Sequence, residues 1–177
     1  ALAVALPNAG NIGGGGFMLV HEAANGHSVA LDFRETAPAS AQRSMYLDAQ
    51  GQVIDGKSLY THHAVGVPGT VAGLTHALQQ WGTLPLEHVL QPAIDLAEQG
   101  YPVSTTLAQA LERAQTTMGR WPATQAIFWK NGEPLKVGDP LVQKDLAQSM
   151  RLIAQQGAKA FYEGEIAQKI AAEMAPH

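Results

Sequence analysis

Four consecutive glycines, Gly13 to Gly16, constrain the fold of this chain more than any other feature of its sequence. They stand directly before an apolar run, Phe17–Val20, which is typical of a buried strand. Glycine has no side chain, so another segment can pack directly on the main chain of a glycine run. We therefore predict close packing against the backbone just before the first strand.

The pattern around this run indicates strands first and helices afterwards. We expect a β-hairpin with strands over residues 17–22 and 28–34, joined by a turn at Asn25-Gly26, a dipeptide that is common in hairpins. From about residue 69 the apolar residues recur at helical spacing. This order of elements indicates an α+β fold. The expected helices are 71–81, 86–97, 105–115 with Ser104 as N-cap, one that starts with Asp139 as cap and Pro140 in its first turn, 158–162 and 166–174, with a short strand at 126–130.

Three expectations qualify these elements. Apolar side chains on all faces of residues 1–6 predict a buried helix that ends at Pro7. Two stripes of apolar residues at helical spacing predict the buried faces of two helices: Val71, Leu74, Leu78 and Trp81, and Leu86, Val89, Leu90, Ala93, Ile94 and Ala97. Pro92 implies that the second of these helices is kinked or starts later than drawn.

The composition excludes several classes of protein. The chain has 177 residues, is 46% hydrophobic and 15% charged, and carries a net charge of −4, with no basic patch that would suit nucleic acid. No apolar run approaches the ~20 residues of a membrane span. Without cysteine there is no disulfide and no cysteine zinc site. Residues 1–6 include neither an initiator methionine nor a basic region, so they do not resemble a signal peptide. Because the chain opens inside an expected buried helix, we expect it to be a piece of a longer protein.

The glycine run and a histidine pair each allow a ligand-binding interpretation. Phosphate loops carry a lysine, follow a strand and open a helix, whereas Gly13–Gly16 precede a strand and have no such lysine. His62-His63 could bind a metal, but adjacent residues of a strand point to opposite faces and no acidic partner stands at a suitable spacing. We expect tight packing, loop histidines, no cofactor and no metal.

Arg34 stands at the exit of an apolar strand and allows two interpretations. It forms a salt bridge with Asp32 or Glu35, or its guanidinium is directed at the carboxylate of a ligand, for which its planar fork is suited. The residues alone do not decide between them. No serine–histidine–acid set can be assigned, so we place no catalytic residue in this chain.

Several blocks of the chain closely resemble the γ-glutamyltransferase (γ-glutamyl transpeptidase) family. The resemblance spans essentially all 177 residues, and the blocks occur in the family's order. They are Pro7 to Met18 with the glycine run, Asp32-Phe33-Arg34-Glu35 with Ala37-Pro38, Gly66 to Gly73, Trp81-Gly82 with Leu84-Pro85, Gln91-Pro92-Ala93, Ala126-Ile127-Phe128, Gly138-Asp139, and Phe161-Tyr162 with Gly164.

The resemblance implies an N-terminal nucleophile hydrolase, in which an αββα sandwich is built from two subunits of a precursor (zymogen) that cleaves itself. A threonine freed at the start of the small subunit attacks the γ-glutamyl amide of glutathione or a related donor, and its own α-amino group serves as base. The γ-glutamyl group then passes to an amino acid, a peptide or water. Residues 1–177 would be a single fragment of the large subunit, with the nucleophile outside this chain.

For this chain the resemblance implies one site residue, Arg34, which would bind the α-carboxylate of the donor. The implied partners are the rest of the large subunit, the small subunit and the γ-glutamyl donor, and the implied location is the periplasm or the cell exterior. Two alternatives remain open. One is a related acylase, such as a cephalosporin or glutaryl acylase or a capsule depolymerase, and the other is a non-catalytic binding domain or pseudoenzyme on the same scaffold.

Overall fold

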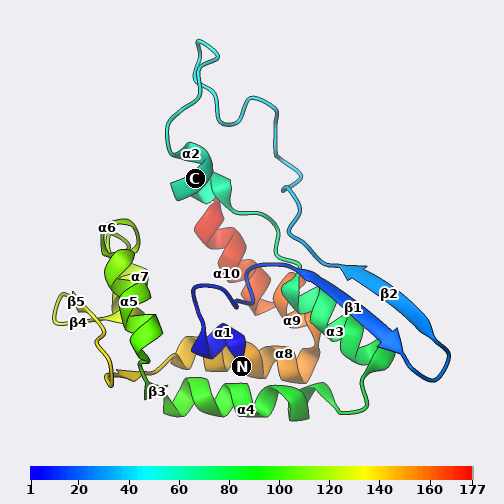
Figure 1. Ribbon diagram of the computed structural model, residues 1–177. Helices are drawn as coiled ribbons and strands as arrows, with labels where there is room; N and C mark the ends of the chain where they lie inside the picture. Colours follow the sequence, from blue (N-terminus) through cyan, green and yellow to red (C-terminus); the bar gives the residue numbers. More distant parts are fainter. Residues whose placement is uncertain (177) are drawn as a thin grey trace. The chain divides into compact units, whose positions relative to one another are not determined.

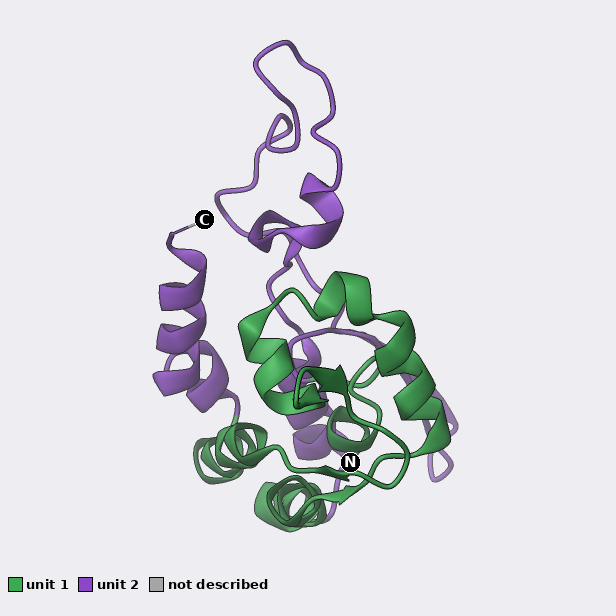
Figure 2. Ribbon diagram, turned by 90° about the vertical axis from the view of Figure 1, so that its left-hand side faces the viewer, with its two compact units in different colours: residues 1–11, 84–157 green, residues 12–83, 158–177 purple. Residues whose placement is uncertain are grey.

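The computed structural model describes residues 1–176, and their contacts form two compact units (Figures 1 and 2). Unit 1 consists of residues 1–11 and 84–157. Unit 2 consists of residues 12–83 and of the described residues from 158 onward. Helices and strands occur in both units, which confirms the α+β class. The two units are described one at a time.

Unit 1 is mainly helical and contains two pairs of very short antiparallel strands, β3 with β6 and β4 with β5. Its elements are α1 (Leu2–Ala5), α4 (Leu86–Gln99), β3 (Tyr101–Pro102), α5 (Thr105–Arg113), α6 (Gln115–Met118), α7 (Pro122–Phe128), β4 (Trp129–Lys130), β5 (Glu133–Pro134), β6 (Pro140–Leu141) and α8 (Lys144–Gln156).

The first core of unit 1 lies between α4 and α8, which run side by side, and includes one residue of α1 (Figure 1). Gln143, just before α8, joins the same three segments: its N–H donates to Ala97 O at 2.8 Å and its Nε2 to Val4 O at 3.0 Å. This buried amide is hydrogen-bonded, so it fixes the start of α8 without the cost of an unpaired polar group. The core consists of Val4, Ala93, Ile94, Ala97, Ala147 and Met150.

A second apolar cluster forms around α5. Ser104 caps this helix as predicted, because its Oγ accepts a hydrogen bond from Leu107 N at 3.2 Å. Next to the cluster, Tyr101 donates its hydroxyl to Val4 O at 2.8 Å, and burial raises the pKa of this phenol. The cluster consists of Val103, Leu107, Leu111, Leu135 and Leu141.

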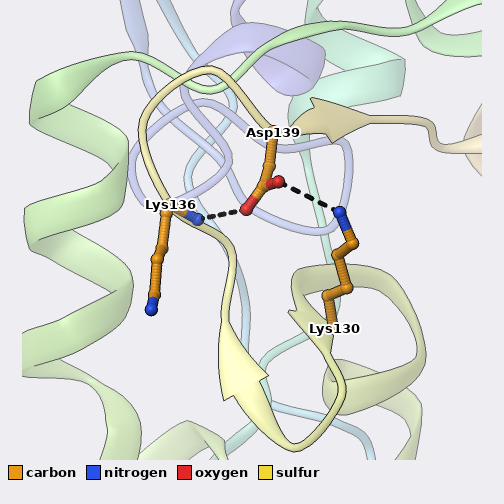
Figure 3. Close-up of polar contacts among 3 residues, drawn as sticks. All are labelled: Lys130, Lys136 and Asp139. Carbon is orange, nitrogen blue, oxygen red and sulfur yellow. Dashed lines mark hydrogen bonds and ion pairs between the residues drawn. The ribbon is translucent and has the colours of Figure 1, made fainter.

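The predicted helix start at Asp139 and Pro140 is wrong. Pro140 belongs to β6, and α8 begins only at Lys144. The Asp139 carboxylate accepts hydrogen bonds from Lys136 N at 2.8 Å and from Lys130 Nζ at 3.2 Å (Figure 3). The backbone N–H of Lys136 and then the Lys130 ammonium lower the pKa of this carboxyl below its ordinary value. An aspartate bonded to the residues before it is not available to cap a helix after it.

Three other expectations for unit 1 need correction. The strand predicted over 126–130 exists only at Trp129–Lys130, because α7 occupies Pro122–Phe128 and begins at a proline, where the missing N–H costs nothing. α4 starts at Leu86 and includes Pro92, so a later start is excluded. In α1, Val4 is fully buried but Leu2 is 66% exposed.

Unit 2 combines a two-stranded hairpin with helices. Here α3 contacts β2 and α9, and α9 contacts α10. Residues 58–68 contain the end of a short helix, α2, and one 3₁₀ turn, η1. The elements are β1 (Phe17–Glu22), β2 (His27–Asp32), α2 (Lys57–Tyr60), η1 (His62–Ala64), α3 (Thr70–Trp81), α9 (Ala158–Tyr162) and α10 (Glu165–Met174).

The hairpin pairs β1 with β2 in antiparallel register, with Phe17 opposite Asp32. The predicted turn at Asn25-Gly26 is confirmed: Gly26 has φ +72°, and Asn25 Nδ2 donates to the Glu22 carboxylate at 2.9 Å. Within residues 1–176 the two strands pair only with each other. Leu19 is 85% exposed, so the expectation of a buried strand is wrong for this face of β1.

α3 confirms the predicted helix over 71–81 and its end at Gly82. Its buried face differs from the expected stripe, because Leu74 is exposed while the small residues Gly73 and Ala77 are buried. Small side chains are required here because this face of the helix lies against the segment after β2. Within residues 1–176, no helix is long and apolar enough to cross a membrane.

Ile94 and Val89 test which face of α4 is buried. Ile94 is 1% exposed and Val89 is 47% exposed, although both belong to the expected apolar stripe. Ile94→Ala should lower the free energy of unfolding of the 177-residue chain by about 2–5 kcal/mol, because it leaves a cavity. Val89→Ala should change it by less than about 0.5 kcal/mol. Urea unfolding followed by circular dichroism measures both, and equal losses would contradict this placement.

Candidate functional site

Arg34 lies two residues beyond the end of β2, which stops at Asp32 rather than at Arg34 as expected. Its backbone N–H donates to Asp32 Oδ1 at 2.9 Å. The side chain is exposed, and within residues 1–176 it forms no ion pair with Asp32 or Glu35. The described structure therefore does not contain the salt bridge between Arg34 and Asp32 or Glu35. The guanidinium forms no ion pair with a carboxylate of residues 1–176.

The backbone of the Arg34 segment lies directly on Gly15. A Cβ atom at Gly15 would stand 2.6 Å from Phe33 O, 2.7 Å from Glu35 N and 2.8 Å from Arg34 Cα, distances that real Cβ atoms essentially never show. Beside it, Phe33 N donates to Gly16 O at 3.0 Å. The prediction that another segment packs on the main chain of the glycine run is confirmed, and that segment is the one that carries Arg34.

The start of α3 meets the same segment from another part of the chain. A Cβ at Gly69 would collide with the carbonyl of Phe33, and a Cβ at Gly73 would collide with the Phe33 side chain. Gly14 O accepts hydrogen bonds from Gly69 N at 2.8 Å and from Thr70 N at 2.9 Å, which satisfies an N–H of the first turn of α3. The glycine run thus binds the start of a helix of its own chain.

A pair of backbone hydrogen bonds holds the chain on the far side of Arg34. Thr36 N donates to Val67 O at 3.2 Å, and Val67 N donates to Thr36 O at 2.8 Å. Gly66 lies beside Glu35, since a Cβ at Gly66 would stand 3.0 Å from Glu35 Cβ. Arg34 therefore projects from a short segment whose backbone is fixed on both sides.

Arg34 lines an open hollow of about 360 Å³ within unit 2. Glu35, Tyr46 and His63 line the same hollow, and the Tyr46 hydroxyl donates to His63 O at 2.9 Å, which ties the loop around Tyr46 to η1. A guanidinium presents a rigid fork of N–H donors that matches a carboxylate through two parallel hydrogen bonds. The geometry of this hollow suits a ligand that carries a carboxylate.

The two histidines singled out from the sequence lie in η1 and have different surroundings. His62 Nε2 lies 3.4 Å from Glu173 Oε1 of α10, whereas His63 lines the hollow beside Arg34. Among residues 1–176 no group of three or more histidines and carboxylates is arranged to hold a metal ion. Both were expected in a loop, whereas the structure places them in the 3₁₀ turn η1.

The hairpin contains a serine–histidine contact that the sequence analysis missed. His21 Nδ1 lies 2.9 Å from Ser28 Oγ, and both residues are exposed. Within the described part of the chain no carboxylate is hydrogen-bonded to the His21 ring, so the third member of a triad is missing there. The register of the hairpin, which places His21 opposite Ser28, was the signal that could have found this pair.

The profile of the family described as Gamma-glutamyltranspeptidase matches residues 1–177. The chain belongs to this family. The resemblance inferred from the sequence blocks is confirmed, and the two largest blocks, around the glycine run and around Gly69, are those that enclose Phe33 in the structure.

Known relatives of this γ-glutamyltranspeptidase chain are longer than it is. The glutathione hydrolase proenzyme of Escherichia coli (strain K12) is 52% identical over 175 residues, which is 98% of this chain and 30% of that protein. The crystal structure of Helicobacter pylori γ-glutamyltranspeptidase has a TM-score of 0.96 at 45% identity, and covers 99% of this chain and 50% of that one. The cephalosporin acylase of Bacillus halodurans has a TM-score of 0.83 at 31% identity, covering 97% of this chain and 32% of that one.

These similarities confirm the expected fold class. The chain shares the fold of γ-glutamyltranspeptidases, which are N-terminal nucleophile hydrolases. It spans about 30% of the length of the curated relatives that it matches. Residues 1–177 therefore correspond to only part of a γ-glutamyltranspeptidase precursor.

Sequence reasoning found Arg34 but missed the residues that hold its segment. Gly69, Gly73 and Tyr162 were noted only as members of familial blocks. Tyr162 donates its hydroxyl to Pro68 O at 2.8 Å and accepts from Ala72 N at 3.2 Å. No local pattern indicates such contacts, because each joins parts of the chain that are far apart in sequence.

Gly73→Ala tests the contact between α3 and the Phe33 side chain. Helix propensity alone predicts that alanine stabilises a helix interior by about 1 kcal/mol relative to glycine. The new Cβ would collide with Phe33, so we expect the opposite sign, a loss of about 1–3 kcal/mol in the free energy of unfolding. Thermal or urea unfolding of the 177-residue chain gives the sign directly, and a more stable variant would show that this contact is not tight.

Proposed function

We propose that the protein containing this chain is a γ-glutamyltransferase that cleaves the γ-glutamyl amide of glutathione or a related donor. The γ-glutamyl group passes to an amino acid, a peptide or water through a threonine acyl-enzyme whose nucleophile lies outside this chain. The family membership of the whole chain and its similarity to the glutathione hydrolase proenzyme of Escherichia coli support this proposal.

The single observation in this chain that carries the proposal is the state of Arg34. Its guanidinium is exposed at a hollow, its backbone is fixed on both sides, and no carboxylate among residues 1–176 neutralises it. A γ-glutamyl donor carries an α-carboxylate at the end remote from the amide that is cleaved. Binding that carboxylate at Arg34 sets the reacting carbonyl in one place relative to the nucleophile.

The chemistry of the contact makes arginine hard to replace. The guanidinium stays charged near neutral pH and binds a carboxylate through two parallel hydrogen bonds. Lysine keeps the charge but offers a point contact at the end of a flexible stem. Glu35 lines the same hollow, and its carboxylate is available to an ammonium group on the same ligand, which a γ-glutamyl donor also carries.

We expect Arg34→Lys in the full-length enzyme to lower kcat/KM roughly tenfold to a hundredfold for a donor with an α-carboxylate, because charge-assisted hydrogen bonds contribute about 1.5–3 kcal/mol each. KM should carry most of the loss if the contact is equally strong in the ground and transition states. Arg34→Ala should lower kcat/KM further and remove the preference for donors with an α-carboxylate. Steady-state kinetics with matched donors, with and without that group, measures both effects.

The matched control for Arg34 is Arg43→Ala. Arg43 is exposed in the same unit and does not line the hollow, so its loss changes the net charge equally without removing the contact. Self-cleavage of the precursor should continue in all these variants, since that step involves no bound glutamyl group. If the two donors lost activity equally in Arg34→Ala, Arg34 would have a structural role only.

The second candidate function is the activity of a related acylase. The similarity to the Bacillus halodurans cephalosporin acylase supports it, and such an enzyme would accept acyl groups without the α-carboxylate and α-amino pair. The donor comparison in the Arg34 experiment separates the two activities. A non-catalytic protein on the same scaffold would show turnover with neither donor, and would lack a threonine at the processing site downstream.

We further propose that residues 1–177 are a single fragment of the large subunit, whose partners are the rest of that subunit and the small subunit. The word proenzyme in the names of the bacterial relatives supports synthesis as a precursor. A periplasmic or secreted location follows as part of the same proposal. Mass spectrometry of the protein purified from its source would detect the two subunits and their junction.

The 177-residue chain alone should not turn over a γ-glutamyl anilide donor. The expected nucleophile lies outside it, and the serine–histidine contact at His21 and Ser28 lacks a third group among the described residues. The assay uses purified chain, with the Arg34→Ala variant of the same chain as control for contaminating host enzyme. Turnover that Arg34→Ala removes would mean that this chain contains its own nucleophile.

A further inference from the structure

We infer that Tyr162 is a positioning residue for Arg34, and that it affects the selection of donors with an α-carboxylate through the start of α3. The inference rests on the proposed function, because it assigns Tyr162 to the same substrate site. The Tyr162 hydroxyl does not line the hollow beside Arg34, so its influence has to pass through the backbone.

The Tyr162 hydroxyl bridges two backbone groups at the beginning of α3. It donates to Pro68 O at 2.8 Å and accepts from Ala72 N at 3.2 Å. The phenol ring is held separately, edge-on to the Phe161 ring with centroids 5.0 Å apart. The hydroxyl can therefore be removed while the ring keeps its packing.

This bridge replaces a helix cap that the local sequence does not supply. The first N–H groups of a helix have no partner within the helix, and the N-cap side chain usually accepts from the third one. In α3 the N-cap is Gly69, which has no side chain, and the third N–H belongs to Ala72. Tyr162 supplies the missing acceptor from a distant part of the chain.

Gly69 has no side chain because the Arg34 segment leaves no space for one. A Cβ at Gly69 would collide with the carbonyl of Phe33, the residue directly before Arg34. A serine or aspartate cap is thus incompatible with the close approach of this segment to α3. The need for an external cap and the position of Arg34 have the same physical cause.

A continuous set of contacts leads from the hydroxyl to Arg34. Tyr162 holds Pro68 and Ala72, which stand on either side of Gly69 and Thr70. The N–H groups of Gly69 and Thr70 donate to Gly14 O at 2.8 and 2.9 Å. Gly69 also touches the Phe33 carbonyl, and the next glycine of the run, Gly15, lies against Arg34 Cα. A shift at the start of α3 therefore moves the backbone from which Arg34 projects.

The test compares Tyr162→Phe with wild type in the full-length enzyme. This change leaves Pro68 O and Ala72 N without their partner, and a neutral hydrogen bond of this kind is worth roughly a three- to tenfold change in an equilibrium. We expect KM for a donor with an α-carboxylate to rise roughly three- to tenfold, with kcat nearly unchanged. KM for a matched donor without that group should stay within about twofold.

Tyr101→Phe is the matched control. The Tyr101 hydroxyl also donates to a backbone carbonyl, Val4 O at 2.8 Å, but both residues belong to unit 1, whereas Arg34 and Tyr162 belong to unit 2. Its loss should lower the melting temperature and leave the ratio of the two KM values unchanged. A readout independent of activity is amide hydrogen exchange, which should become faster at Gly69, Thr70 and Ala72 in Tyr162→Phe and not in Tyr101→Phe.

The outcomes separate this inference from the proposed function. A change in the KM ratio together with faster exchange at the start of α3 supports it. If Arg34→Ala removes the preference for the α-carboxylate while Tyr162→Phe affects both donors equally or neither, the proposed function stands and the positioning role of Tyr162 is wrong. If neither wild type nor Arg34→Ala distinguishes the donors, the proposed function fails and the role assigned to Tyr162 fails with it.

Discussion

The close approach of the Phe33 carbonyl to Gly69 is the constraint on which unit 2 depends. It requires a glycine at the N-cap of α3, and the adjoining Phe33 side chain requires a second glycine one turn later, at Gly73. From the other side, Gly15 admits the main chain of residues 33–35. A helix, a hairpin and a glycine run therefore meet at one peptide, and side chains on any of them would force the three apart.

The consequence for Arg34 is a backbone held by hydrogen bonds that carries an exposed side chain. Hydrogen bonds from Phe33 and Thr36 hold the main chain before and after it, while the guanidinium itself is exposed. Ordering a long side chain on binding opposes association by about 0.5–1.5 kcal/mol. Under the proposed function, a ligand would have to order only the side chain of Arg34, because the backbone is already held by these hydrogen bonds.

Local signals in the sequence predicted local structure well. Ser104 caps α5 because the acceptor and its donor, Leu107 N, are only three residues apart, and the Asn25-Gly26 turn depends on bonds within the same few residues. The glycine run correctly indicated main-chain packing. Its partner, the segment around Phe33, could not be derived, since nothing in the run itself encodes which distant backbone fills the space.

The failures arise where contacts in the folded chain override a local pattern of capping or apolar residues. Asp139 and Pro140 have the local pattern of a helix start, but pairing with β3 and the bonds to Lys130 and Lys136 prevail. Leu74 and Val89 belong to apolar stripes, yet their exposure depends on what covers each helix. Arg34 was recognised through its sequence block, and its supporting residues were not, because their roles exist only once α3 and α9 are brought together.

The capping of α3 by Tyr162 also has a consequence for the order of events during synthesis. The hydroxyl joins residues that are 90 and 94 positions apart, and all of the second part of unit 1 is translated between them. At roughly 5–20 residues per second, about 5–19 s pass between the synthesis of α3 and that of its cap. During this interval the start of α3, which lies against the Arg34 segment, lacks the two hydrogen bonds that the Tyr162 hydroxyl forms. The start of α3 therefore receives its cap only after the second part of unit 1 has been synthesised, and the length of that part sets the delay.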